Sequence, residues 1–124
     1  MSQSYELLNP ILVGPVTLKN RIALAPMVVM LASPDGALTK RSMDYYVRYA
    51  RGGVGLIIVE GTVRDEKEGK GVPSGFAIHN IGYVTGFNKI VKLVKDQGAS
   101  IVLQIAIIGQ GDLGWDSEEV RKQR

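Results

Sequence analysis

Three short runs of aliphatic residues alternate with two segments whose apolar positions recur at helical spacing. The aliphatic runs cover residues 21–25, 54–61 and 99–108. Continuous runs of this kind are typical of parallel strands that are buried on both faces. Their alternation with helical segments predicts a parallel sheet whose strands are joined by helical crossovers.

The two helical segments have recognisable ends. The first is predicted to begin after Thr39, as its N-cap, and to end at Gly52. Its apolar positions follow the i, i+3, i+4, i+7 spacing and are Met43, Tyr46, Val47 and Ala50. The second is predicted over residues 83–97, and its expected buried stripe consists of Val84, Phe87, Val91 and Val94.

Two closures of such a sheet are open on these residues alone, a doubly wound sheet and a (β/α)8 barrel. The turn after Ala25 carries no G-x-G-x-x-G motif, which disfavours a dinucleotide-binding doubly wound fold. A full (β/α)8 barrel takes about 250 residues. The chain has 124 residues, about half of that length, and is expected to form one domain.

Composition and charge narrow the classes of function. The chain is 45% hydrophobic and 22% charged, as globular proteins are, and it contains no cysteine. Its net charge of +3 comes from lysines and arginines scattered among acids, so we expect no nucleic-acid partner. No signal peptide is visible, and the longest apolar run, residues 22–32, is shorter than a membrane span. We therefore expect a cytoplasmic protein without a membrane partner.

Candidate chemistry gathers where the predicted strands end, because function in both architectures lies at the carboxyl ends of the strands. Pro26, Met27 and Val28 form an apolar turn after the first strand. Gly61 follows the second strand and lets a flat ligand approach the backbone. Gln104 is an amide within the third aliphatic run and needs hydrogen-bond partners. Together they suit a flat heteroaromatic ring; alternatively, Gln104 bonds to a neighbouring loop and Gly61 only packs.

Neither a catalytic residue nor a metal site can be assigned from the pattern. Glu60 is the carboxylate at a strand end, and it could act as a general base or as a structural acceptor for loop amides. His79 is the only histidine and stands in a loop, where a lone histidine is more often incidental than catalytic. No other histidine or cysteine is present to complete a metal site.

Three ordered blocks of the sequence stand out as a set: LLNPILVGPVTLKNRIALAPM, DGALTKRSMDYYVRYARGGVGLIIVEGT and GFNKIVKLVKDQGASIVLQI. Together they resemble the Old Yellow Enzyme family of NADH:flavin oxidoreductases. The shared residues include Asn20, Arg21, Pro26, Gly61 and Gln104, and the resemblance extends to about Gly109.

This resemblance implies an α/β fold that comprises the first three βα units of a (β/α)8 TIM barrel, in a single partial domain over residues 1–124. It also implies FMN as cofactor and NADH or NADPH as reductant. Pro26, Met27 and Val28 would lie under and beside the isoalloxazine ring. Gly61 would offer its backbone to the pyrimidine side, and Gln104 would hydrogen-bond the pyrimidine edge.

The sequence departs from the family pattern at several positions. Val28 stands where many members have Thr or Cys, and Met30 where some have tyrosine. Ile107 and Gln110 replace a histidine and an arginine on the substrate side. The tail, residues 110–124, is atypical, although Asp116 with a glutamate three positions on indicates a capping box that opens a helix.

The resemblance therefore implies FMN-dependent NAD(P)H oxidoreductase activity for the parent protein, an ene-reductase-like hydride transfer to a small-molecule acceptor such as an activated alkene. This chain would supply part of the flavin site and no acid–base group. The alternative is a truncated or degenerate, non-catalytic half-barrel that self-associates and binds no flavin.

We also expect association, with copies of the chain or with a complementing chain, because three strands cannot close the barrel. The residues expected to face its incomplete interior are Leu24, Ile57, Val59, Leu103 and Ile105.

Overall fold

The computed structural model describes residues 5–64 and 74–106. The predictions for Ile107, Gln110, the capping box at Asp116 and the tail 110–124 lie outside the described residues. In chain order the elements are η1 (Glu6–Leu8), β1 (Ile11–Val13), β2 (Val16–Leu18), β3 (Ala23–Leu24), α1 (Lys40–Arg51), β4 (Leu56–Val63), η2 (Ile81–Tyr83), α2 (Val84–Lys95) and β5 (Ser100–Ala106).

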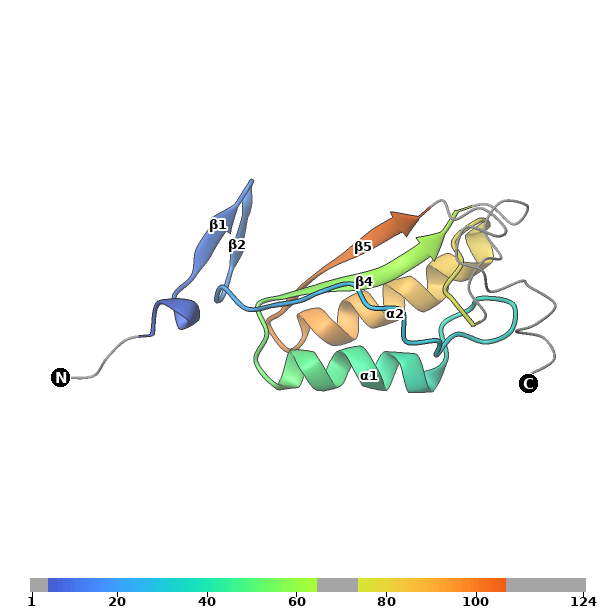
Figure 1. The fold of residues 1–124 in the computed structure, drawn as a ribbon, viewed down its shortest axis with the longest axis horizontal. Helices are drawn as coiled ribbons and strands as arrows, with labels where there is room; N and C mark the ends of the chain where they lie inside the picture. The colour runs from blue at the N-terminus through green and yellow to red at the C-terminus, as the bar shows by residue number, and fades with distance from the viewer. Residues whose placement is uncertain (1–4, 65–73, 107–124) are drawn as a thin grey trace, which may run out of the picture.

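The main sheet has the parallel order β3-β4-β5, as the alternation of strands and helices predicts. Leu24 pairs with Ile57, and Ile57 pairs with Ile101, so these three residues form one row across the sheet. Both helices lie on the same side of the sheet (Figure 1). The described part is thus a layer of helices on a parallel sheet, the arrangement of consecutive βα units.

The hydrophobic core lies between the sheet and the two helices. Its buried residues are Leu24, Ala32, Tyr46, Ala50, Ile57, Val59, Phe76, Phe87, Ile90, Val94 and Ala99. The expectation that Leu24, Ile57 and Val59 face the barrel interior is therefore wrong, because these side chains pack with those of the helices. The same expectation is wrong for Leu103, which is in register with Val59 and packs against the same core.

The opposite face of the sheet carries the residues between these positions, since side chains alternate along a strand. Val102 lies on that face and is 49% exposed. Ile105, two residues after Leu103 on the same strand, is 53% exposed although it does not lie on the face of Val102.

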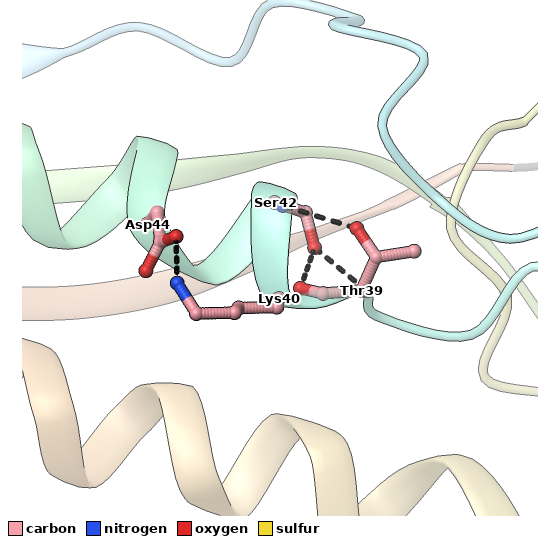
Figure 2. Close-up of polar contacts among 4 residues, drawn as sticks. All are labelled: Thr39, Lys40, Ser42 and Asp44. Atoms are coloured by element: carbon pink, nitrogen blue, oxygen red, sulfur yellow. Dashed lines mark hydrogen bonds and ion pairs between the residues drawn. The ribbon is translucent and has the colours of Figure 1, made fainter.

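Helix α1 begins where the sequence predicts, and a reciprocal capping box explains why (Figure 2). The Ser42 amide donates to Thr39 Oγ1 at 3.1 Å, and the Thr39 amide donates to Ser42 Oγ at 3.0 Å. Such caps stabilise a helix by about 1 kcal/mol. Lys40 and Asp44 form an exposed ion pair one turn apart, which contributes little.

The buried stripe of α2 differs in part from the prediction. Phe87 and Val94 are buried, but Ile90 is the third buried residue, while Val84 and Val91 are half-buried. The apolar residues of α2 are numerous enough that two overlapping stripes fit the helical period. Contact with the core, rather than spacing, selects the stripe that contains Ile90.

A hairpin that the sequence analysis did not anticipate precedes the sheet. β1 and β2 pair antiparallel around Gly14, which has a φ of 56°. The hairpin lies at the end of the molecule away from the carboxyl ends of β4 and β5 (Figure 1). It therefore belongs to the opposite end of the sheet from the candidate site.

A side-chain contact ties β3 to the loop before β4. Asn20 is buried, and its Nδ2 donates to the Gly53 carbonyl at 2.7 Å while its Oδ1 accepts from the Ile22 amide at 3.1 Å. The Ile22 carbonyl accepts the amides of Gly55 and Leu56. Within the described residues, no helix is long and apolar enough to cross a membrane.

Candidate functional site

A β-bulge shapes the carboxyl end of β4. Val59 pairs with Leu103 and Thr62 pairs with Ile105, so Glu60 and Gly61 together stand opposite Gln104. A bulge re-aims the side chains around it and is frequent next to active sites. Here the bulge interrupts the alternation of side chains along β4 at Gly61, a residue predicted to belong to the site.

Gly61 and Gln104, both predicted site residues, lie in contact. A Cβ added to Gly61 would stand 3.4 Å from Gln104 Oε1 and 3.2 Å from Ala106 Cβ. The Gln104 side chain is exposed and makes no hydrogen bond with another described residue. The bulge thus places bare backbone next to an available amide.

The other predicted residues form an apolar turn at the end of β3. Met27 is 48% exposed and Val28 is 45% exposed, whereas Pro26 is half-buried. We call Pro26, Met27, Val28, Gly61 and Gln104 the strand-end site. All five stand at the carboxyl edge of the same parallel sheet, where βα proteins bind ligands.

Hydrogen bonds hold the apolar turn on both sides of Met30, a residue in the left-handed conformation. Met30 has a φ of 53°, a conformation that costs a residue with a side chain roughly 1–2 kcal/mol. Before it, the Val29 amide donates to Glu60 Oε2 at 2.7 Å. After it, the Leu31 carbonyl accepts from Thr39 Oγ1 at 2.7 Å. The anchors on either side keep Met30 in this conformation.

Glu60 is fully buried, at 0% exposure, and binds the turn directly. Burial raises the pKa of its carboxyl, while the Val29 amide and the Tyr46 hydroxyl act to lower that pKa. Its Oε1 is buried and has no hydrogen-bond partner among the described residues. Of the two roles weighed for Glu60, the contact with Val29 confirms that of acceptor for a loop amide.

Sequence reasoning missed Val29 as a residue of this region. The available signal was a carboxylate in an aliphatic run, followed by glycine, because a buried acceptor needs a donor from a neighbouring segment. Which donor it takes depends on the pairing of β3 with β4, which brings together residues 31 positions apart.

The strand-end site fits a flat ring system such as a flavin. Two exposed apolar side chains, Met27 and Val28, offer surface for a ring face. Gly61 leaves room that a Cβ would fill, and Gln104 beside it offers both a donor and an acceptor. These are the contacts that a heteroaromatic ring with a polar edge requires.

His79 lies in the loop before α2, two residues after Ala77, which pairs with Val63 at the end of β4. Its Nε2 lies 3.4 Å from the Tyr83 hydroxyl, which donates to the Asp35 carbonyl at 2.8 Å. No group of three metal-ligating side chains occurs within residues 5–64 and 74–106. The described contacts of His79 are thus with Tyr83, in the loop region before α2.

Residues 6–122 match the model of the NADH:flavin oxidoreductase / NADH oxidase family. The chain belongs to this family. A relative, an NADH oxidase from Thermoanaerobacter brockii, is 40% identical over 98 residues, which are 79% of this chain and 15% of the relative. An NADPH dehydrogenase from Bacillus subtilis is 37% identical over 85% of this chain and 31% of its own length.

The fold agrees with that assignment. The Old Yellow Enzyme homologue from Zymomonas mobilis superimposes with a TM-score of 0.73 at 35% identity, over 82% of this chain and 28% of that structure. The α/β prediction, βα units of a TIM barrel, is thereby confirmed. The family uses FMN with NADH or NADPH as reductant, and this chain spans less than a third of the relatives described above.

Proposed function

We propose that this chain forms part of the flavin site of an FMN-dependent NAD(P)H oxidoreductase that reduces small-molecule acceptors. The proximity of Gly61 to Gln104 carries the proposal, because it places backbone without a side chain beside an exposed amide that bonds to no other described residue. Membership of the NADH:flavin oxidoreductase family supports FMN as the ligand.

The residues of the strand-end site have distinct roles in this proposal. Pro26, Met27 and Val28 hold the isoalloxazine ring and exclude water from one face of it. The Gly61 backbone approaches the pyrimidine side, and Gln104 hydrogen-bonds the pyrimidine edge. When bound, FMN supplies hydride transfer from NADH or NADPH to an acceptor. This chain contributes binding and orientation, and we assign no catalytic residue to it.

We propose an activated alkene as the acceptor class. Two relatives support this choice by their names, a cinnamate reductase from Clostridium sporogenes and an NADH:acrylate oxidoreductase from Vibrio harveyi, each 35% identical to this chain. Both named substrates carry a carbon–carbon double bond conjugated to a carboxylate. We also propose a cytoplasmic location, because a chain without cysteine is compatible with a reducing compartment.

The test is a titration of the purified chain with FMN, followed by quenching of flavin fluorescence and by the visible absorbance of bound flavin. Saturable binding is expected. Gly61→Val should weaken it strongly, since the side chain would enter the space beside Gln104. Gly82→Val is the comparison variant, because Gly82 is exposed, stands in η2 and is not one of the five residues of the strand-end site; its added Cβ would meet Asn80 Oδ1, at 2.9 Å. Absence of FMN binding by the wild-type chain would refute the proposal.

We further propose that the sheet is completed by association, with a second copy or with a complementing chain. Within the described residues β3 and β5 each pair with β4 alone, so each offers an unpaired edge. Val102 and Ile105 of β5 are about half exposed. Light scattering coupled to size exclusion tests this, and a well-folded species of 13.5 kDa would refute it.

A further inference from the structure

We propose that Glu60 is a positioning residue, whose buried carboxylate holds the apolar turn of the strand-end site in the conformation that receives the flavin. This inference rests on the proposed function for its ligand. Its structural part, the contact between Glu60 and Val29, can be tested whether or not FMN binds.

The contact acts on the orientation of Val28. The Val29 amide belongs to the peptide group that joins Val28 to Val29, and it donates to Glu60 Oε2 at 2.7 Å. Fixing the plane of that peptide restricts how Val28 is presented. Glu60 thereby links β4 to the one segment of the strand-end site that has no strand pairing of its own.

The carboxylate is itself well placed to stay rigid. Glu60 is 0% exposed and stands in the bulge, directly before Gly61. Its own amide donates to the Tyr46 hydroxyl at 3.4 Å, and its carbonyl accepts from Thr62 Oγ1 at 3.0 Å. One residue therefore connects both halves of the strand-end site, the turn through its side chain and Gly61 through the peptide bond.

Glu60 Oε1 is buried and has no hydrogen-bond partner among residues 5–64 and 74–106, so packing alone does not account for a carboxylate at this position. A buried acceptor without a partner opposes folding, and an apolar residue of similar size would avoid that cost. The charged oxygen that does have a partner binds the turn. A role in positioning accounts for a carboxylate here, whereas core packing does not.

Three variants distinguish the positioning role of Glu60 from the effect of its charge and from its contribution to packing. Glu60→Gln keeps an oxygen that can accept the Val29 amide and removes the charge. Glu60→Leu removes both. Thr62→Val is the control for the Glu60 backbone, because it deletes the buried hydroxyl that bonds the Glu60 carbonyl and leaves the contact of the carboxylate with the Val29 amide in place.

The first measurement is amide hydrogen exchange at Val29, which needs no flavin. Exchange in Glu60→Leu should be at least about tenfold faster than in the wild type, because the amide loses a charge-assisted hydrogen bond. Glu60→Gln should restore most of the protection, and Thr62→Val should retain it. Equal exchange at Val29 in the wild type and Glu60→Leu would overturn the proposal.

The second measurement is FMN affinity by fluorescence quenching. Glu60→Leu should bind about tenfold more weakly, while Glu60→Gln and Thr62→Val stay within about threefold of the wild type. Equal FMN affinity in all four proteins would overturn the positioning role and leave the proposed function standing. If the wild type binds no FMN, the proposed function fails, and exchange at Val29 still decides the structural part.

A third measurement applies if Glu60→Leu does not fold. The Val29 amide proton resonance of the wild type should then shift with pH as the carboxyl titrates, and Glu60→Gln should show no such shift. Tyr46 and Tyr45 are the other titratable groups whose charges act on this carboxyl, and both ionise at higher pH. A resonance that does not move with pH in the wild type would overturn the proposal.

Discussion

Two glycines should respond in opposite directions to the same substitution, and the reason lies in the space beside each. A Cβ on Gly55 would stand 2.5 Å from Asn20 Oδ1 and 2.6 Å from the Asn20 carbonyl oxygen. The second contact is with backbone, so a side-chain rotation cannot relieve it. A Cβ on Gly86, within α2, would meet only Leu38, at 3.6 Å and 3.8 Å.

The magnitudes follow from these contacts. Overpacking costs about 1–3 kcal/mol. Moving Asn20 would also weaken its two hydrogen bonds, to Gly53 and Ile22, at about 0.5–1.5 kcal/mol each. Gly55→Ala should therefore lower the free energy of unfolding by about 2–6 kcal/mol. Gly86→Ala should raise it by about 0.5–1 kcal/mol, because alanine is the better helix former.

Urea unfolding followed by circular dichroism at one protein concentration measures both changes. The comparison is internal, since both variants add one methyl group to the same protein. A Gly55→Ala variant as stable as the wild type would refute the packing described around Asn20. A destabilised Gly86→Ala variant would refute the placement of Gly86 beside Leu38.

Three further outcomes are expected. Val28→Thr should raise the midpoint potential of bound FMN, since a hydroxyl beside the ring adds a hydrogen bond worth about 0.5–1.5 kcal/mol. Spectroelectrochemistry measures the potential, and an unchanged value would mean that Val28 does not touch the ring. Gln104→Leu should weaken FMN binding about 2- to 12-fold, the loss of one hydrogen bond. It should leave the stability of the flavin-free protein unchanged, because the Gln104 side chain bonds to no other described residue. A lower melting temperature of the flavin-free variant would mean that Gln104 stabilises the fold. The raised pKa of Glu60 means that the folded state holds its proton more tightly than the unfolded state, so stability should fall as pH rises from the ordinary carboxyl pKa through the raised one. Melting temperatures of Glu60→Gln should lack that component, and an identical pH profile would contradict it.

Local signals predicted what local contacts determine. Helix α1 was placed correctly because Thr39 and Ser42 close a capping box within one turn. The strand-end positions of Gly61 and Gln104 were predicted because parallel strands bring their carboxyl ends to one edge. Neither inference required knowledge of residues far apart in the chain.

The failures share a different cause. An unbroken aliphatic run shows no alternation, so nothing local indicates which side chains of β4 face the helices, and Ile57 and Val59 were assigned to the wrong face. The hairpin strands, β1 and β2, have three residues each, too few for a clear period. The contact of Glu60 with Val29 depends on strand pairing that no local pattern records.

The left-handed conformation of Met30 has a consequence for engineering. Substitutions at position 30 must first tolerate a positive φ, and only then can their contacts with a ligand matter. A screen of such substitutions therefore confounds backbone conformation with ligand binding. Glycine and asparagine enter with a conformational advantage, and β-branched residues enter with a handicap, whatever acceptor is screened. Activities of variants at this position therefore become informative only after normalisation to the amount of folded protein, with Met30→Gly as the conformational reference.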